Sequence, residues 1–572
     1  MAYFLKKSNR KNGLYLQIYE SFHDSVSKST RHKAIKTIGY VSKLQEQGIE
    51  DPIAHYSKEV ERMNKQRREE KENANQKLIS ESPIRNIGYF LAKAVVNKLK
   101  IESQLKPYNI VRDFDFDVFR MLEALLYSRI VSPLSKLKTW QEVIPTLYGG
   151  YSFSLNQIYE ACQFFGEEYE RIIEIFNHQI KEIYGRKTGK VYFDCTNYYF
   201  EIDYEHEDKQ KGPSKENRKE PIIGMALMLD ENQIPLGMKM YPGNQSEKPY
   251  LRSMVKDLRN RHNITGKTIQ VADKGLNCGQ NIYEAIRAHD GYLFSKSVKM
   301  LPAIEKEWVF LKNNGQWNDV KDGDGEIIYQ YKECVDNFTY TITDENGIRR
   351  AITVPEKRVL TFSPALAKKQ IAEIQKLAEK AINLSKSYAK KNEYGECSKY
   401  VRFSSVNTST GEISNEKDVI AVINTDKIEA DKKLAGFNLL VTSETGMKST
   451  EIYKVYHNLW KIEESFRILK GQLDARPVYL RNRESIYGHF LICYLSVSIL
   501  RILQYIEFDD NICCNTIVDF IRSFQCIEDK KSVINMASLK KIKPIDDRLN
   551  LNLTHYYFSS KKLNDLLSFR LR

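Results

Sequence analysis

The stretch that most constrains the fold runs from residue 189 to residue 298. GKVYFDCTNYYFEI, PIIGMALMLD and IPLGMKMYPG are rich in β-branched and aromatic residues, which is typical of strands, and ENQ joins the last two as a hairpin. EKPYLRSMVKDLRNRH then predicts a helix, KTIQVADKG a strand, GQNIYEAIRAHD a helix and GYLFSKSV a strand. Three meandering strands followed by alternating helices and strands predict a mixed α/β sheet.

This order is interrupted and then resumed. Residues 299–435 are long, polar and mixed, whereas GFNLLVTS (436–443) again predicts a buried strand. A stretch of this length cannot be a loop inside one compact domain, so we expect an insertion subdomain at 299–435. The core would then comprise 188–298 and 436–505, with the element order of the RNase H-like nuclease core.

The rest of the chain divides by composition. Residues 1–57 contain short strand-like runs around a polar turn and predict a small β-hairpin-rich unit. Residues 58–83 form a charged helix or linker. Residues 84–187 show helical spacing with interspersed Arg and Lys, so this unit either binds DNA or only packs. Residues 506–572 are left as a C-terminal tail.

The bulk charge favours a polyanionic partner. Lys and Arg total 88 against 74 Asp and Glu, a net charge of +14, and the pI is near 9.0. Such a balance is typical of nucleic-acid-binding proteins, although general solubility explains it equally well.

The cysteines and apolar runs bear on location. Nine cysteines occur without a CxxC pair, which argues against a zinc site and fits a reducing cytoplasm. The N-terminus lacks the apolar core of a signal peptide. The longest apolar run, FLICYLSVSIL (490–500), is too short to span a bilayer and predicts a buried helix. We therefore expect a cytoplasmic protein without a membrane partner.

Two aspartates stand out by their position. Asp194 lies inside the apolar strand YFDCT, where an aspartate is disfavoured and must be paired, hydrogen-bonded or metal-bound. Asp273 ends the strand TIQVAD, just before Lys274, at a position common for chemistry in α/β sheets. For Asp273 alone, a turn or helix-cap role is the simpler interpretation.

The helix YHNLWKIEESFRILK (456–470) supplies a third carboxylate. At about 100° per residue, Glu463 falls in one sector with Tyr456, Trp460, Arg467 and Lys470. An adjoining apolar stripe is expected to face the core; its members are Val455, Leu459, Ile462, Phe466, Leu469 and Leu473. Glu464 is turned about 100° further, toward water. The alternative is an ordinary i,i+4 pair of Glu463 with Arg467 on a solvated face.

Three carboxylates from separate elements suit a two-metal site. Asp194, Asp273 and Glu463 could hold two Mg²⁺ or Mn²⁺ ions about 4 Å apart, since these ions prefer carboxylate and water ligands. Such a pair activates a water or hydroxyl and stabilises the leaving 3′-oxygen in phosphodiester transfer. The basic net charge would then serve a DNA substrate.

At these residues the chain resembles bacterial insertion-sequence transposases of the DDE type, in the group with a Y-x2-R-x3-E-x6-K signature. The signature aligns with Tyr456, Leu459, Glu463 and Lys470, and Leu459 stands where the family has arginine. VYFDCT is similar to the first-aspartate strand and VADKGLNCGQNI to the second-aspartate turn. GMKMYPGNQSEKP resembles the strand before the intervening helix, and the large insertion before the glutamate also fits.

The resemblance implies cut-and-paste transposition. Terminal inverted repeats would be bound and nicked, and the free 3′-hydroxyl would attack the other strand and then target DNA, with a homodimer in the synaptic complex. It implies DNA contacts for the signature residues and their neighbours, namely Tyr456, Trp460, Arg467, Lys470 and Lys274. An aromatic residue of the insertion, Trp308 or Trp317, could stack on a flipped base, although core packing is the simpler interpretation of both.

Two other functions remain open at this point. One is a structure-specific DNA nuclease on the same RNase H-like core, without strand transfer. The other is a catalytically inactive, transposase-derived DNA-binding repressor, against which the presence of all three carboxylates argues.

Overall fold

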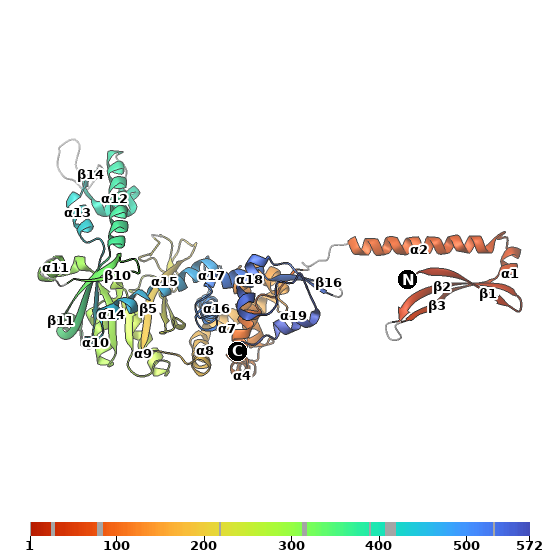
Figure 1. The fold of residues 1–572 in the computed structure, drawn as a ribbon, viewed down its shortest axis with the longest axis horizontal. Helices are drawn as coiled ribbons and strands as arrows, with labels where there is room; N and C mark the ends of the chain where they lie inside the picture. Colours follow the sequence, from red (N-terminus) through yellow and green to blue (C-terminus); the bar gives the residue numbers. More distant parts are fainter. Residues whose placement is uncertain are drawn as a thin grey trace. The chain divides into compact units, whose positions relative to one another are not determined.

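The computed structural model describes residues 2–24, 29–76, 84–216, 219–311, 317–387, 391–405, 419–529 and 532–571. The chain divides into two compact units, Met1–Pro83 and Ile84–Arg572. Each unit is described by itself, and its elements can be followed by label in Figure 1.

The first unit is a three-stranded antiparallel sheet with a long helix. Its strands lie in the order β1-β2-β3, with β1 at Tyr3–Arg10, β2 at Gly13–Asp24 and β3 at Ser29–Tyr40. The predicted hairpins are therefore present. The short α1 (Val41–Glu46) leads to α2 (Pro52–Gln76).

Helix α2 is anchored to the sheet of the first unit. The backbone N–H of Tyr3 donates to Asn64 Oδ1 at 2.8 Å, and Asn64 Nδ2 donates to the Tyr3 carbonyl at 2.9 Å. Arg67 also pairs with Glu20 of β2 at 2.6 Å. The boundary that composition suggested between residues 57 and 58 thus falls inside one continuous helix that packs on the first unit.

A nine-stranded mixed sheet forms the centre of the second unit. Its order is β10-β11-β12-β15-β9-β8-β5-β6-β7. The chain builds part of it in the predicted sequence, as β5 (Lys190–Tyr199), β6 (Ile222–Leu229), β7 (Pro235–Pro242), α9 (Lys248–Asn260), β8 (Ile269–Ala272), α10 (Gly279–Arg287) and β9 (Gly291–Lys296). Strands β5, β8 and β9 are parallel to one another, whereas β6 and β7 are antiparallel. The mixed α/β sheet is confirmed.

Strand alternation gives the sheet two different faces. Val191, Phe193 and Cys195 of β5 share a core with residues of α9 and α10 such as Leu251 and Ile282. Tyr192 and Tyr198 of β5 belong instead to the larger core. That core also contains residues of α14 (Ser449–His457), α15 (Trp460–Arg467) and α16 (Arg483–Ile502). Even-numbered residues of β5 therefore face these three helices.

The expectation that all of 299–435 forms a separate subdomain is wrong for its first half. Strands β10 (Asn318–Lys321), β11 (Ile327–Thr343) and β12 (Arg349–Phe362) extend the central sheet. Strand β12 pairs with β15 (Phe437–Thr442), the strand that resumes the core, and so satisfies that strand's backbone groups. Only the remaining segment lies outside the sheet.

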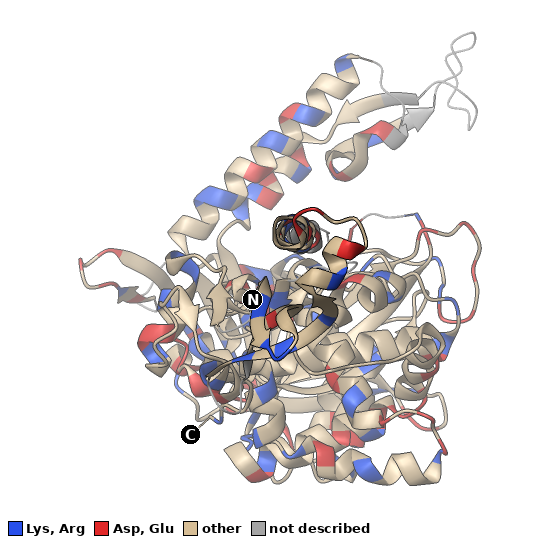
Figure 2. Cartoon of the chain, turned by 90° about the vertical axis from the view of Figure 1, so that its right-hand side faces the viewer, with Lys and Arg blue, Asp and Glu red and all other residues tan. Residues whose placement is uncertain are grey.

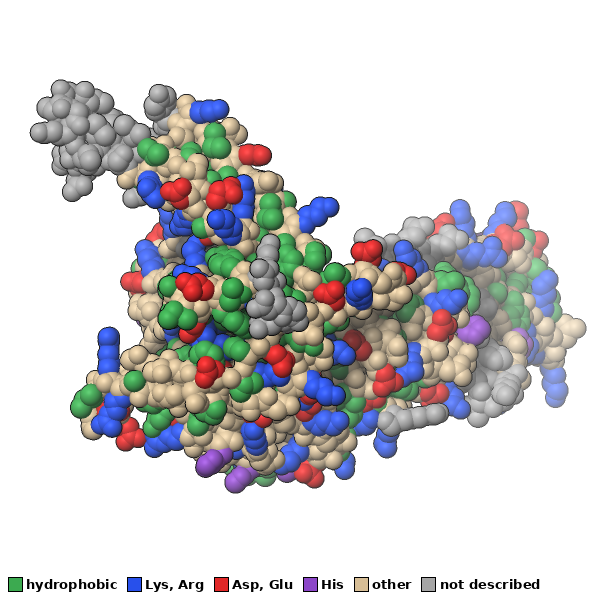
Figure 3. Space-filling model, turned by 60° about the vertical axis from the view of Figure 1, so that its left-hand side comes forward, with side chains coloured by type: hydrophobic (Ala, Val, Ile, Leu, Met, Phe, Trp, Pro, Cys, Tyr) green, Lys and Arg blue, Asp and Glu red, His purple; other side chains and the backbone are tan. Residues whose placement is uncertain are grey.

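The second half of the insertion carries its own small cores. It contains α12 (Pro364–Lys386), a 3₁₀ segment (Lys391–Tyr400), β13 (Val401–Ser405), β14 (Val419–Ile423) and α13 (Thr425–Lys433). Figure 2 shows basic and acidic residues alternating along the protruding α12. Figure 3 shows hydrophobic side chains among charged ones on the surface of the insertion. Ile327, Ile328 and Val335 of β11 are exposed apolar residues.

The helical unit and the C-terminal residues fold together, so 506–572 is not a tail. Strand β4 (Ile84–Asn86) pairs with β16 (Gln525–Asp529), in a sheet of order β18-β17-β16-β4. The N-terminal helices are α3 (Phe90–Lys98), α4 (Ile101–Val111), α5 (Val118–Val131), α6 (Lys136–Lys138), α7 (Leu155–Glu167) and α8 (Tyr169–Tyr184). The C-terminal elements are α17 (Cys514–Ser523), β17 (Ser532–Asn535), α18 (Leu539–Leu549), β18 (Tyr557–Phe558) and α19 (Ser560–Leu567).

Helix α16 is a buried central helix of this unit. All of its residues from Ser485 to Ile502 are buried, as the apolar run predicted. Gly166 of α7 and Gly488 of α16 let the two backbones pass closely, since a Cβ atom at either position would collide with the other helix's backbone. Within the described residues, one segment, 483–507, is long and apolar enough to cross a membrane, and its most apolar 18-residue stretch is wholly buried in the protein.

Candidate active site

Three polar residues stand in a row across the parallel strands. Phe193 of β5 pairs with Ala272 of β8, which pairs in turn with Phe294 of β9. One residue further along each strand stand Asp194, Asp273 and Ser295. The two predicted aspartates are therefore neighbours at the carboxyl end of β8, as expected for a site in an α/β sheet.

Asp194 is held by a backbone amide and a lysine. The N–H of Cys195 donates to Asp194 Oδ1 at 2.7 Å, and Lys215 Nζ lies 3.5 Å from the same oxygen. Lys215 also lies 3.3 Å from Glu247 Oε1. The pKa of Asp194 is raised to about 6, mainly by burial and also by the charges of Glu247 and Asp273, against the opposing effect of Lys215. A second positive charge at this carboxylate would therefore be stabilising.

Asp273 accepts two hydroxyl hydrogen bonds on one oxygen. Ser295 Oγ donates to Asp273 Oδ1 at 2.9 Å, and the Tyr456 hydroxyl donates to the same oxygen at 3.0 Å. Burial raises the pKa of the Tyr456 phenol, and the negative charges of Asp273 and Glu463 add to this effect. Tyr456, expected to contact DNA, also joins α14 to the second aspartate.

The two adjacent glutamates have different environments, and that of Glu464 is not the one predicted. Glu464 is not turned to water, because its Oε2 lies 3.0 Å from Nη1 of the fully buried Arg501. The Tyr505 hydroxyl also donates to Glu464, at 3.4 Å. Glu463 is exposed, and no described residue forms a hydrogen bond or ion pair with its side chain. The alternative i,i+4 pair of Glu463 with Arg467 is therefore absent among the described residues.

The predicted apolar stripe is confirmed, with a break in the helix. Val455, Leu459, Ile462, Phe466, Leu469 and Leu473 are all buried. The segment forms α14, a turn at 458–459, α15 and then a π-helical turn, Ile468–Gln472, instead of one continuous helix. Leu459, at the position where the resembling family has arginine, packs into the core with 8% of its surface exposed.

The predicted DNA-contacting residues fall into two groups. Lys274 and Arg467 are exposed, and Trp460 is 49% exposed, so all three are accessible to a ligand. Lys470 is half-buried, with Nζ 2.9 Å from Glu216 Oε1, and Arg476 pairs with the other oxygen of Glu216. Burial lowers the pKa of Lys470. The Glu216 carboxylate therefore pairs with two cations, Lys470 and Arg476.

Trp308 and Trp317 have a packing role in this structure. Both are partly buried against the core that contains α9 and α10. The Lys332 ammonium lies 4.9 Å from the Trp308 ring centroid and 5.0 Å from that of Trp317. Their rings therefore enclose a buried cation, which fits the simpler interpretation of both residues.

The three carboxylates are the type of ligand that a hard divalent cation prefers. Three carboxylates from three elements would offer only oxygen atoms, the ligands that Mg²⁺ and Mn²⁺ prefer. Within the described residues, however, no three His, Cys, Asp or Glu side chains already converge as a metal site. Asp194 and Asp273 lie on adjacent strands, whereas Glu463 comes from α15 and forms no cluster with them among the described residues.

Four residues of this site are not predicted by the sequence. Lys215, Glu216, Glu247 and Ser295 carry no periodic signal, because loop residues and a strand serine are common everywhere. Glu247 lies in the GNQSEKP stretch that was singled out for its resemblance, so its position offered a hint.

Comparisons with known proteins bear on the family of the chain. The model of the family described as transposase DDE domain matches residues 181–499, more than half of the 572-residue chain. No curated protein is significantly similar in sequence. A cryo-EM structure of a piggyBac transposase synaptic complex with hairpin DNA aligns at 9% identity, with a TM-score of 0.33 and 83% of each chain covered. That likeness is too weak to carry an argument, whereas the family match is extensive: the chain belongs to the transposase DDE domain family.

Proposed function

We propose that the protein is a DNA transposase that binds the terminal inverted repeats of its element and carries out metal-dependent strand cleavage and strand transfer by a cut-and-paste route. The observation that carries this proposal is the placement of Asp194 and Asp273 on adjacent parallel strands, on the side that α15 covers with the free Glu463. The family match agrees, since it spans all three residues.

Asp194, Asp273 and Glu463 are the residues that would hold two Mg²⁺ or Mn²⁺ ions. Bound ions would activate the attacking water or 3′-hydroxyl and stabilise the leaving 3′-oxygen. The chain's own residues prepare the site. Ser295 and Tyr456 fix one oxygen of Asp273, which leaves its other oxygen available. Lys215 holds Asp194 and Glu247 together until a stronger cation competes for them.

The exposed residues near the carboxylates position the DNA. Lys274 follows Asp273 directly and Arg467 follows Glu463 by one helical turn, so both lie where a phosphate backbone would pass. The exposed Trp460 ring offers a surface for a base or sugar. We propose that two copies of the chain act together in the synaptic complex, one for each element end.

Strand cleavage on the natural ends tests this proposal. DNA flanking the gene is read for short inverted repeats bounded by a direct duplication, and those repeats are supplied as labelled duplexes in Mg²⁺. We expect Asp194→Asn, Asp273→Asn and Glu463→Gln each to abolish cleavage while end binding remains. Glu451→Gln is the matched control, because Glu451 is an exposed glutamate of α14 without a side-chain partner among the described residues.

Strand transfer separates a transposase from a nuclease. Pre-cut ends with a free 3′-hydroxyl are incubated with target DNA, and joined products are expected. Cleavage without joining would favour a structure-specific nuclease on this core. Binding without any metal-dependent cleavage would favour an inactive repressor.

A further inference from the structure

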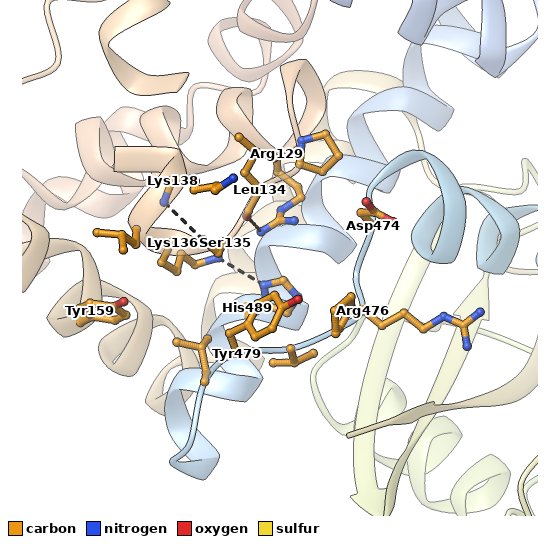
Figure 4. Close-up of a pocket in the computed structure, with 15 residues that line it drawn as sticks. Arg129, Leu134, Ser135, Lys136, Lys138, Tyr159, Asp474, Arg476, Tyr479 and His489 are labelled. Carbon is orange, nitrogen blue, oxygen red and sulfur yellow. Dashed lines mark hydrogen bonds between the residues drawn. The ribbon is translucent and has the colours of Figure 1, made fainter. Parts of the chain in front are cut away.

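A pocket of about 550 Å³ is lined by residues other than the three carboxylates (Figure 4). Its lining comes from 133–138 around α6, from Tyr159 of α7, from the loop 474–480 and from α16. The pocket therefore lies between the helical unit and the loop that follows the signature helices. A volume of this size fits a ligand of nucleotide size.

A buried lysine without an acidic partner lies in this pocket. Lys136 is 7% exposed, and its Nζ lies 3.2 Å from His489 Nδ1. Because His489 Nε2 lies 3.1 Å from the Ala475 carbonyl oxygen, the hydrogen bonds fix Nε2 as the donor and Nδ1 as the acceptor. One ammonium N–H is thereby used, and the structure gives no carboxylate partner for it among the described residues.

A second buried cation in the lining has no carboxylate partner within the described part of the chain. Arg129 is 5% exposed, and its guanidinium donates there to two backbone carbonyls, those of Leu473 at 3.3 Å and Leu134 at 3.2 Å. The pKa of Lys136 is lowered to about 8, mainly by burial and also by the charge of Arg129. Asp474 is the one carboxylate of the lining, and no described residue forms an ion pair with it. Buried cations of this kind are stabilised when an anion binds.

The rim of the pocket adds aromatic surface. Tyr159 is 39% exposed and Tyr479 is 70% exposed, and both line the pocket. Lysines next to accessible aromatic rings are the usual combination in sites for unpaired nucleic acid, where the cations bind phosphate and the rings stack on bases. Free inorganic phosphate would need the cations alone.

The pocket is connected to the candidate active site through one residue. Arg476 lines the pocket and pairs with Glu216, the carboxylate that also pairs with Lys470 of the signature segment. A strand that lies along Lys470 can therefore continue past Arg476 into the pocket. A phosphate inside a duplex cannot reach cations that are more than nine-tenths buried, whereas an unpaired nucleotide can turn in.

We propose that this pocket binds one unpaired nucleotide of the DNA strand, with its phosphate at Lys136, Lys138 and Arg129 and its base against Tyr159 or Tyr479. The proposal rests on the proposed function, because it takes DNA as the substrate. It adds a subsite that holds a strand end displaced from the duplex beside the reacting phosphodiester.

Binding without metal tests this subsite separately from catalysis. The full-length protein is titrated in EDTA with a labelled single-stranded oligonucleotide and with a duplex of random sequence, and anisotropy is recorded. We expect Lys136→Met to weaken single-strand binding about tenfold, to reduce the slope of log K against log salt by about 0.7 and to leave duplex binding unchanged. Tyr159→Ala should weaken single-strand binding, and Tyr159→Phe should restore it.

Lys332→Met is the matched control. Lys332 is another buried lysine, but it donates to backbone carbonyls and lies outside the pocket. If Lys136→Met does not fold, Lys138→Met combined with Tyr479→Ala makes the same test at exposed positions. Three results overturn the subsite: unchanged single-strand affinity in these variants, equal losses for duplex and single strand, or competition by inorganic phosphate without oligonucleotide binding. Loss of cleavage with intact single-strand binding would instead count against the proposed function.

Discussion

Arg501 of the buried helix α16 lies 3.0 Å from Glu464, and this ion pair leaves the adjacent Glu463 as the free carboxylate of the signature segment. Arg501 is fully buried and also donates to Ser465 and Gln504, so its charge is satisfied from several sides. The pair thus anchors α15 to the core in the orientation that exposes Glu463. A structural role and a catalytic role are divided between two neighbouring glutamates.

Substitution of the two glutamates should separate these roles. Glu464→Ala leaves the Arg501 charge buried without its carboxylate, so we expect a loss of about 3 kcal/mol in the free energy of unfolding. Glu463→Ala removes an exposed side chain and should change that free energy by less than about 0.5 kcal/mol. Denaturant titrations of both variants check this prediction. Equal stability losses would contradict the assignment of Arg501 to Glu464.

Asp194 should make the metal-free protein less stable as the pH rises. Its pKa in the folded protein is about 6, above the usual value of about 3.9. Between these values the folded state binds more protons than the unfolded state, so the free energy of unfolding falls as pH rises through this window and is constant above it. Asp194→Asn should remove this dependence and stabilise the protein by about 3 kcal/mol at pH 7.

Thermal unfolding of both proteins in EDTA from pH 4 to pH 8 provides the measurement. The two curves should approach each other near pH 4 and diverge up to about pH 6. Lys215 retains Glu247 as a partner in the variant, so it is not left unpaired. A wild-type protein that is the more stable one at pH 7 would contradict the prediction.

Glu216→Gln should strengthen DNA binding. Glu216 pairs with both Lys470 and Arg476, and its pKa is held low mainly by hydrogen bonds from these two cations, against the effect of burial. Removal of the negative charge frees two cations for phosphate, so we expect about tenfold tighter binding at low salt and a steeper salt dependence. Filter binding over a range of salt concentrations measures both. Glu220→Gln, at a partly exposed acidic residue of the same loop, should leave affinity unchanged.

Lys215→Met should strengthen divalent-ion binding. The Lys215 ammonium lies between Asp194 and Glu247 and competes with any other cation for these carboxylates. Its removal should lower the Kd for Mn²⁺ several-fold, which isothermal titration calorimetry can measure in the absence of DNA. Weaker Mn²⁺ binding would mean that Lys215 orients Asp194 instead of competing with the ion.

Local sequence patterns were sufficient to predict most strands of the central sheet. The strands around Asp194 and Asp273 are dense in β-branched and aromatic residues, and the helices between them show clear periodicity, so element order followed from the sequence. The pairing of β12 with β15 did not follow. A β-strand's partner depends on contacts distant in sequence, and nothing in RVLTFS states that it pairs with FNLLVT.

Contacts distant in sequence also decide part of the candidate active site, and local patterns do not predict them. Helical phase placed Glu463 correctly beside the buried stripe, but it also assigned Glu464 to water, because a phase argument assumes that charge marks the solvated side. Arg501, the residue directly after the apolar run 490–500, supplies a charge inside the core and reverses that assignment. Loop residues such as Lys215 and Glu216 reach the site only through tertiary folding, which no local pattern encodes.

The most direct test of the central claim is iron-mediated cleavage of the protein itself. Fe²⁺ replaces Mg²⁺ at an oxygen-ligand site, and ascorbate with peroxide then produces radicals that cut the nearest backbone. If Asp194, Asp273 and Glu463 hold the catalytic ions, the full-length protein should be cut near residues 194, 273 and 463, and Mg²⁺ or Asp194→Asn should suppress all three cuts. Cuts elsewhere, or cuts that persist in Asp194→Asn, would contradict the assignment.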